Sequence, residues 1–333
     1  MLKHYTIPIF IPELACPFQC VFCNQKKISG QTHDPTGDEI IETIENHLRT
    51  FKAKHKYVEV GFFGGSFTGI SIDEQKRYLK YVQPYIRLEH VQSIRLSTRP
   101  DYISEEILRM LKKYNVTTIE LGAQSFDDEV LRKTKRGHNS QQIEKAAALI
   151  KDYGFKLGLQ MMIGLPGDTL EKSIATAKKI IKIGADNTRI YPAVVIKDTQ
   201  MHKWYEQGRY KPLNLEEAVN WTKQLLPLFE KAGVNIIRVG LHPSEGLVSG
   251  EDLIDGPFHP SFKELVITHI WQDLLKPVID LENKKSIEIH VPINEINYAI
   301  GHKSANKNML LAKFDKVKFV GDSNLLPRSF KIH

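Results

Sequence analysis

The feature that most constrains the fold is a regular alternation of short apolar segments with longer amphipathic ones. Six times, a short segment of β type precedes a segment with helical periodicity. The pairs are 5–12 with 37–51, 57–65 with 73–86, 93–100 with 104–114, 117–125 with 140–153, 156–167 with 170–183, and 187–196 with 214–232. Serial βα units need parallel strands joined by helical crossovers. We therefore expect an α/β fold, a partial (β/α)6 barrel of TIM type, with 234–241 as a closing strand.

All three cysteines, Cys16, Cys20 and Cys23, lie just after the first expected strand. Barrels of this type carry their functional groups on the loops that follow the strands. The odd number and close spacing of the thiols argue against disulfides. Structural zinc prefers four ligands, and only a residue such as His33 lies near enough in the sequence to complete a set. A [4Fe-4S] cluster held by three cysteines instead leaves one iron open to a substrate or cofactor, so the pattern favours iron–sulfur.

Charge and hydropathy narrow the class of partner. The net charge of +7 is compatible with a polyanion such as RNA, although a basic excess also serves simply to solvate a surface. The chain has no apolar run of about eighteen residues, and its first ten residues lack the features of a signal peptide. We therefore expect a cytoplasmic protein with no membrane partner.

The spacing C-x3-C-x2-C, with Phe22 directly before the last cysteine, resembles the radical S-adenosylmethionine (radical SAM) superfamily. The resemblance extends over roughly residues 5–275. It implies a [4Fe-4S] cluster and S-adenosyl-L-methionine as cofactors, with Phe22 beside them. It also implies an enzyme that reductively cleaves SAM to methionine and a 5′-deoxyadenosyl radical, with an electron donor such as flavodoxin or ferredoxin.

The stretch "FFGGSF" at 62–67 resembles the family's GGE motif. By that resemblance, Gly64, Gly65 and Ser66 would hold the methionine amino group of SAM. Serine stands where the family has glutamate, which leaves backbone carbonyls as the acceptors. Paired glycines also suit a tight turn, the alternative for this segment.

Two later strand ends complete the SAM site implied by the resemblance. Gln124 and Ser125 would hydrogen-bond the ribose, with capping of the following helix as the alternative role of Ser125. Gln160, Met162 and Gly164 would lie beside the adenine, with core packing as the alternative for Met162.

Four segments narrow the resemblance to the radical SAM domain of the Elongator catalytic subunit and its stand-alone bacterial relatives. They are 96–103, 131–138, 189–213 and 256–262. The Elongator subunit modifies the wobble uridine of tRNA and uses a C-terminal acetyltransferase domain, for which we expect no room in these 333 residues. Relatives that need further cysteines, such as methylthiotransferases, do not fit either. The resemblance thus implies radical chemistry on RNA, with tRNA as the preferred substrate.

Polar side chains at strand ends are candidates for substrate contacts, because arginine binds phosphate through two hydrogen bonds and stacks on bases. The alternative role for each of them is a structural ion pair or a charge at a helix edge. These candidates are Arg95, Arg99, Arg189, Tyr191 and Arg238.

The last fifty residues form a separate unit in the sequence. Segment 286–292 reads as a strand and is followed by a short helix, "GHKS", a second helix and a strand, an order that resembles a KH-type core with its GxxG loop. Residues 301–333 contain seven Lys or Arg and two Asp or Glu. Gly301 matches the first glycine of the GxxG loop, and Ser304 replaces the second. The resemblance implies RNA contacts by Gly301, His302, Lys303, Ser304 and Lys307. A basic helical hairpin that caps the barrel is the alternative.

These observations predict a barrel over 1–245, a helical extension over 246–279 and a small basic KH-like domain over 280–333. The leading hypothesis is a radical SAM enzyme that modifies RNA, with tRNA as the favoured substrate. The alternatives are a radical SAM enzyme for a small metabolite or peptide, and a noncatalytic iron–sulfur protein that binds RNA.

Overall fold

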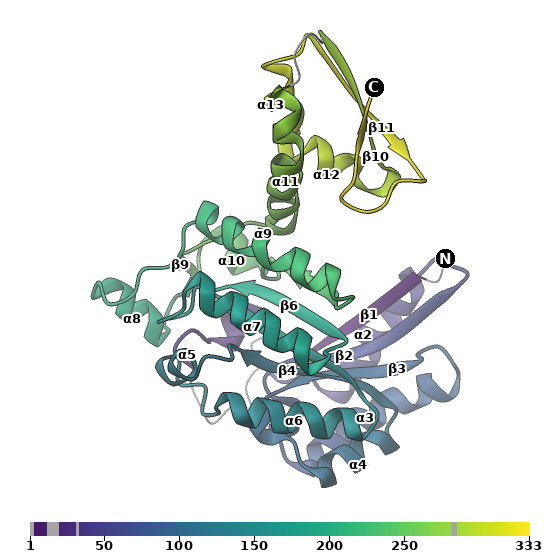
Figure 1. Cartoon of the computed structure of the whole chain (residues 1–333). Helices are drawn as coiled ribbons and strands as arrows, with labels where there is room; N and C mark the ends of the chain where they lie inside the picture. The colour runs from purple at the N-terminus through teal and green to yellow at the C-terminus, as the bar shows by residue number, and fades with distance from the viewer. Residues whose placement is uncertain (1–2, 12–19, 31–32, 281–284) are drawn as a thin grey trace.

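A computed structural model describes residues 3–11, 20–30, 33–280 and 285–333. Its larger part is a curved sheet of seven strands in the order β1-β2-β3-β4-β5-β6-β8, covered on the convex side by helices (Figure 1). Its strands are β1 (Lys3–Ile11), β2 (Lys56–Gly64), β3 (Ser93–Thr98), β4 (Val116–Gln124), β5 (Lys156–Ile163), β6 (Asn187–Pro192) and β8 (Asn235–Val239). Its helices are α1 (Gln25–Ser29), α2 (Gly37–Thr50), α3 (Ile72–Arg87), α4 (Glu105–Lys113), α5 (Asp128–Lys133), α6 (Ser140–Asp152), α7 (Leu170–Ile183), α8 (Gln200–Glu206), α9 (Leu215–Lys231), α10 (Glu245–Ser249) and α11 (Phe262–Leu275).

Neighbouring strands of this sheet all pair in parallel. The predicted series of six βα units with a closing strand is therefore confirmed, and so is the partial barrel. One expected strand, 187–196, is divided in two. Pro192 ends β6, since proline cannot donate to the next ladder bond, and β7 (Val195–Ile196) instead pairs antiparallel with β9 (Leu253–Asp255).

Local signals set the boundaries of the barrel helices. Thr36 and Glu39 form a reciprocal capping box at the start of α2, and Asn139 with Gln142 does the same for α6. Gly184 ends α7 in the left-handed conformation. The helices then bury their apolar faces against the sheet.

The C-terminal part has a three-stranded sheet of its own. It consists of β10 (Ser286–Pro292), β11 (Lys316–Asp322) and β12 (Lys331–Ile332), with α12 (Ile296–Ile300) and α13 (Ala305–Leu311) between the first two strands. The expected order of strand, helix, loop, helix and strand is present, with β10 and β11 parallel. The short antiparallel β12 was not expected from the sequence.

Helix α11 joins the two parts by packing into both cores. Every fourth residue from its start belongs to the barrel core, namely Phe262, Val266 and Ile270. A second set with the same spacing belongs to the core of the C-terminal sheet, namely Ile267, Trp271 and Leu275. Segment 246–279, expected as an extension or linker, therefore contains a helix that both cores share.

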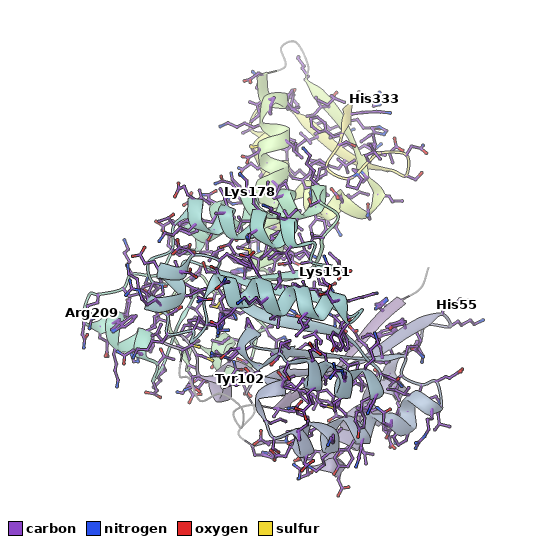
Figure 2. All side chains as sticks on the ribbon, turned by 60° about the horizontal axis from the view of Figure 1, so that its bottom comes forward. His55, Tyr102, Lys151, Lys178, Arg209 and His333 are labelled. Carbon is purple, nitrogen blue, oxygen red and sulfur yellow. The ribbon has the colours of Figure 1, made fainter. Side chains whose placement is uncertain are left out.

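Figure 2 places His55, which precedes β2, and Arg209, which follows α8, at opposite edges of the molecule. Helix α8 lies toward the carboxyl ends of the barrel strands (Figure 1). Among the described residues, no helix has the length and hydropathy needed to cross a bilayer.

Candidate cofactor and substrate cavity

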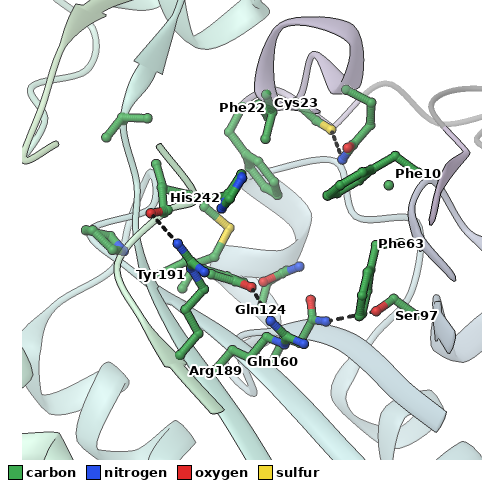
Figure 3. Close-up of a pocket in the computed structure, with 18 of the residues that line it drawn as sticks. Phe10, Phe22, Cys23, Phe63, Ser97, Gln124, Gln160, Arg189, Tyr191 and His242 are labelled. Carbon is green, nitrogen blue, oxygen red and sulfur yellow. Dashed lines mark hydrogen bonds between the residues drawn. The ribbon is translucent and has the colours of Figure 1, made fainter. Parts of the chain in front are cut away.

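A cavity of about 430 Å³ occupies the concave side of the barrel toward the carboxyl ends of its strands (Figure 3). Its volume falls in the range of small-molecule sites, about 300–1,000 Å³. Side chains from all seven strands of the sheet line it, together with described residues that follow Cys20, among them Phe22 and Cys23. The cavity therefore lies where a parallel barrel places its chemistry.

Strand β1 contributes to the cavity through every second residue. Thr6, Pro8 and Phe10 line it, and Phe10 pairs across the strands with Phe63, their ring centroids being 6.2 Å apart. The sequence reasoning missed this apolar wall. Its signal was the period-two alternation of β1, whose other face is buried under the helices.

The described cysteines lie at the rim of the cavity. Cys23 lines it beside Phe22, and Cys20 is buried behind them. The Cys23 amide donates to the Cys20 carbonyl over 3.0 Å, and Gln25 Nε2 donates to Cys23 Sγ over 3.2 Å. Cys16 lies outside the described residues. The alternative zinc ligand, His33, instead pairs with Glu39 Oε1 at 3.0 Å at the start of α2.

Two neighbouring segments hold the cysteine loop in place. The Val21 amide donates to the Thr134 carbonyl over 3.2 Å, and the Met201 amide at the start of α8 donates to the Val21 carbonyl over 2.7 Å. Arg136, which is buried, donates from Nη1 to Cys20 Sγ over 3.2 Å and from Nη2 to the Gly122 carbonyl over 2.5 Å. Cys20 and Val21, in the described end of the loop, are thus held against the barrel.

The cavity also contains groups that fit SAM. Gly64 has a φ of +104°, and a Cβ there would come within 2.6 Å of the Ile11 carbonyl oxygen, so only glycine allows this close backbone approach. Gln124 lines the cavity, and its buried Oε1 accepts no hydrogen bond from the described residues. A buried acceptor without a donor suits a ligand hydroxyl. Thiols, a glycine turn and an open amide oxygen together fit a cluster with bound SAM.

Gln160 and Met162, the candidates from β5, line the same cavity. Gln160 Nε2 donates to Ser97 Oγ over 3.2 Å and to Glu120 Oε2 over 3.0 Å, which fixes the orientation of its amide. Met162 is partly buried and packs against the cluster that contains Phe22 and Met201. Both side chains therefore reach the cavity, and their contact with the adenine stays a prediction.

Other predicted SAM contacts lie outside the lining of this cavity. Gly65 donates its amide to the Ile11 carbonyl over 2.7 Å, and Ser66 is buried next to it. Ser125 is also buried, and its hydroxyl accepts from the Asp127 amide over 3.1 Å. Its alternative role as the cap of the following helix is wrong, because Asp127 caps α5. The ribose contact of Ser125 stays a prediction. Gly164 lines a different cavity, described below.

A buried ion network forms the floor of the cavity. Arg95 donates to Glu59 over 2.9 Å and to Glu120 over 2.8 Å, and Arg189 binds both oxygens of Glu120 at 2.6 and 3.0 Å. Burial would raise the pKa of Glu120, but Arg189 and Arg95 hold this pKa below its usual value. Two guanidinium groups balance two carboxylates, so the floor is neutral. Arg95 has the structural role that was its alternative.

Arg189 and Tyr191 reach the cavity from this floor. Arg189 Nη1 lies 3.5 Å from the Tyr191 hydroxyl oxygen, to which it donates. Burial raises the pKa of Tyr191, so the phenol is neutral and able to donate to a ligand.

Of the two arginines that line this cavity, Arg238 is the one that pairs with no carboxylate of the described residues. Its guanidinium donates to the Gly240 and Leu241 carbonyls over 3.1 and 3.2 Å. Burial, and then Arg189, lower the pKa of Arg238, and burial with Arg238 lowers the pKa of His242 on the same wall. This side of the cavity therefore favours an anionic or electron-rich group of a ligand.

Arg99 has a different position from that expected of a substrate contact. It is buried outside the cavity lining, where Nε and Nη2 each donate to Asp101 over 2.9 Å and Nη2 also donates to the Arg136 carbonyl. Asp101 in turn faces His138. Arg99 thus positions the 134–138 segment, which holds the cysteine loop.

The loop of the C-terminal part is tied to α11. The His302 amide donates to Thr268 Oγ1 over 2.8 Å, and Asn306 Nδ2 donates to the Thr268 carbonyl over 3.0 Å. Gly301, Lys303 and Ser304 have φ values of +88°, +50° and +61°. Lys303 is exposed and Lys307 is partly exposed. The KH-type interpretation of this loop stays a prediction.

Comparisons with known proteins agree with this geometry. A family model described as the Radical SAM superfamily matches residues 11–180, and one described as the Radical SAM C-terminal domain matches residues 185–272. The second match ends within α11. Together the two matches run from the last residue of β1 into α11, with a short gap at 181–184.

Curated relatives match about half of the chain. A tRNA uridine(34) acetyltransferase of Methanocaldococcus infernus is 31% identical over 193 residues, which are 51% of this chain and 36% of the relative. Elongator complex protein 3 of Saccharomyces cerevisiae is 32% identical over 165 residues, which are 49% of this chain and 29% of the relative. The chain thus spans about a third of the length of these relatives.

A solved structure shares the fold. The archaeal Methanocaldococcus infernus Elp3 with its N-terminus deleted superimposes with a TM-score of 0.66 at 24% identity, covering 82% of this chain and 64% of that one. The superfamily uses a [4Fe-4S] cluster and SAM, for which the cavity has fitting residues. With the sequence matches and the curved parallel sheet, this shows that the chain belongs to the radical SAM superfamily of enzymes.

Proposed function

We propose that this enzyme modifies RNA, and specifically tRNA. The observation that carries the proposal is the single cavity in which Cys23, Gly64 and Gln124 meet the cationic wall of Arg238. The names of the curated relatives, tRNA uridine(34) acetyltransferase among them, support tRNA as the substrate class. The net charge of +7 and the basic C-terminal part favour a polyanionic partner.

The chain's own residues have distinct roles in this proposal. Cys16, Cys20 and Cys23 hold the [4Fe-4S] cluster, which with SAM supplies a 5′-deoxyadenosyl radical when an electron donor of flavodoxin or ferredoxin type reduces it. Gly64, which lines the cavity, offers its backbone to SAM, and Gln124 Oε1 accepts from a ligand hydroxyl. Gln160 and Met162 lie beside the adenine. Phe10, Phe22 and Phe63 exclude water from the reacting side of the cavity.

The substrate contacts in this proposal come from the wall of the cavity that β6 and β8 form. Arg238 pairs with an electron-rich edge or an anionic group of the entering nucleotide, and the neutral Tyr191 hydroxyl donates to it. Arg189 stays bound to Glu120 and orients Tyr191. Residues Gly301, His302, Lys303, Ser304 and Lys307 contact the RNA backbone outside the cavity.

The test is anaerobic. The cluster is reconstituted and reduced with dithionite, SAM is added with and without bulk tRNA, and 5′-deoxyadenosine is measured by mass spectrometry. Stimulation by tRNA supports the proposal and justifies mapping of the altered nucleoside. Equal cleavage with and without tRNA points to a small substrate, and absence of 5′-deoxyadenosine points to a noncatalytic protein.

The matched control is Cys20→Ala. Because Cys20 packs in a small cluster apart from the main core of the barrel, this variant should keep its circular dichroism spectrum while losing iron and SAM cleavage. SAM cleavage by an iron-free variant would contradict the assignment of the cluster.

A further inference from the structure

We propose that a second cavity, beside the first, binds a single-stranded nucleotide of the RNA substrate; this rests on the proposed function. The cavity has a volume of about 420 Å³ and lies between the loop after β5, the segment after α8, and α9. Three aromatic residues, Trp204, Tyr210 and Trp221, line it. Three cations, Lys133, Arg209 and Lys211, lie around them.

The aromatic residues are held in position before any ligand binds. The Tyr210 hydroxyl donates to the Gly164 carbonyl over 2.7 Å, and the amides of Arg209 and Tyr210 donate to the Trp204 carbonyl over 2.8 and 3.3 Å. Trp221 comes from the rigid helix α9. Aromatic rings with a cation beside them are the usual platform for unstacked bases in single-stranded RNA.

The cations of this cavity are available for phosphate. Arg209 and Lys211 are exposed, and neither forms an ion pair within the described part of the chain. The Arg209 guanidinium lies 5.5 Å from the Trp204 ring centroid. Lys133 pairs with Glu129 at 2.8 Å and completes the rim. A basic rim around aromatic rings matches a nucleotide better than a neutral metabolite.

Asp168 gives the cavity one directional acceptor. Its carboxylate accepts from the Gly164 amide at 2.9 Å, Ser173 Oγ at 2.8 Å and the Thr169 amide at 2.9 Å. A carboxylate has about four acceptor positions, so one remains for the N–H edge of a base. The cavity thus offers stacking, phosphate pairing and a hydrogen-bond acceptor together.

This cavity shares a wall with the first one. Trp204 and Tyr210 pack against the cluster that contains Phe22, Leu165 and Met201. Phe22 lines the first cavity, and Leu165 lines the second. A nucleotide held here therefore lies next to the reacting cavity, where a neighbour of the modified nucleotide would be.

Tryptophan fluorescence tests the site directly. The chain has three tryptophans, of which Trp204 and Trp221 line this cavity and Trp271 lies in the core of the C-terminal sheet. Titration with short single-stranded oligouridylate should quench the emission of the wild type and of Trp271→Phe. In Trp204→Phe the quenching should fall to less than half.

Binding measurements use charge variants, because Arg209 and Lys211 are exposed and their replacement keeps the fold. The double variant Arg209→Gln/Lys211→Gln should bind the labelled oligouridylate about tenfold more weakly by fluorescence anisotropy. The control Lys178→Gln/Lys182→Gln removes the same charge from α7, away from this cavity, and should bind like the wild type (Figure 2).

The outcomes separate the two proposals. If tRNA stimulates SAM cleavage while the Arg209/Lys211 variant binds RNA like the wild type, the second cavity is not the RNA site and the proposed function stands. If the two charge variants lose affinity equally, binding is nonspecific and the site is again excluded. If the wild type binds no RNA at all, the proposed function fails and this site fails with it.

Discussion

The guanidinium of Arg136 donates a hydrogen bond to the sulfur of Cys20 over 3.2 Å, although 116 positions separate the two residues. The same guanidinium binds the Gly122 carbonyl at the end of β4. A hydrogen bond to a ligand sulfur orients it and tunes the metal that it holds. This one side chain therefore links Cys20 to the end of β4 and orients its sulfur.

Replacing Arg136 should weaken the cluster site. We expect Arg136→Gln to hold less iron after reconstitution and to have a lower cluster reduction potential, because a hydrogen bond to a ligand sulfur raises the potential. Arg136→Lys keeps the charge, so its iron content and reduction potential should lie between those of the wild type and those of Arg136→Gln. An EPR-monitored redox titration measures the potential, and an unchanged potential in Arg136→Gln would sink this account.

The neutral floor of the cavity depends on Glu120. Glu120→Gln leaves Arg95 and Arg189 with one carboxylate, Glu59, and we expect a loss of about 3–5 kcal/mol in the free energy of unfolding, as for other broken buried pairs. Urea denaturation measures it. The same substitution at Glu105, whose partner Arg109 is exposed, should leave the midpoint unchanged. Equal effects at the two sites would show that burial of the network is unimportant.

The close backbone approach at Gly64 makes a second prediction about stability. Gly64→Ala places a Cβ 2.6 Å from the Ile11 carbonyl oxygen at a φ of +104°. Gly208→Ala is the control, since its φ is +66° and nothing lies within 4 Å of the added Cβ. We expect Gly64→Ala to be about 1–3 kcal/mol less stable than the control, and to bind SAM more weakly. Equal stabilities would contradict the clash.

Asp168 makes stability depend on pH. Burial raises the pKa of this carboxyl from 3.8 to about 6. The folded state then holds a proton that the unfolded state releases, so the stability contributed below pH 3.8 is lost as pH rises through about 6. We expect this loss to be about 3 kcal/mol. Asp168→Asn should remove this pH-dependent loss. Urea denaturation of both proteins between pH 4 and 7 tests it, and parallel curves would contradict the shifted pKa.

The repeating units of the barrel could be predicted because each carries its own local signal. β1 alternates its residues between two environments, and α2 has a capping box at its start, so both elements follow from short windows of sequence. The break after Pro192 also had a signal, the proline itself, but the pairing of β7 with β9 joins residues nearly sixty positions apart. No local pattern contains that pairing.

Some residues of the site could likewise be predicted from local sequence, and others could not. Gln124, Gln160 and Met162 follow from their places at strand ends, and the structure brings them to one cavity. Arg95 and Arg99 are arginines of equal promise in the sequence, yet carboxylates hold both of them: Asp101, two positions away, holds Arg99, and Glu59 and Glu120 from the neighbouring strands hold Arg95. For Arg95, whether the arginine faces a ligand or an acid depends on which strands become neighbours, and that is decided by the assembled fold.

The position of α11 in both cores has a consequence for how the protein melts. Phe262 and Trp271 lie on the same helix but in different cores, so the helix cannot unwind without disrupting both. The barrel and the C-terminal sheet should consequently unfold in one cooperative transition, and a substitution on either face of α11 should shift the melting temperature of the whole chain.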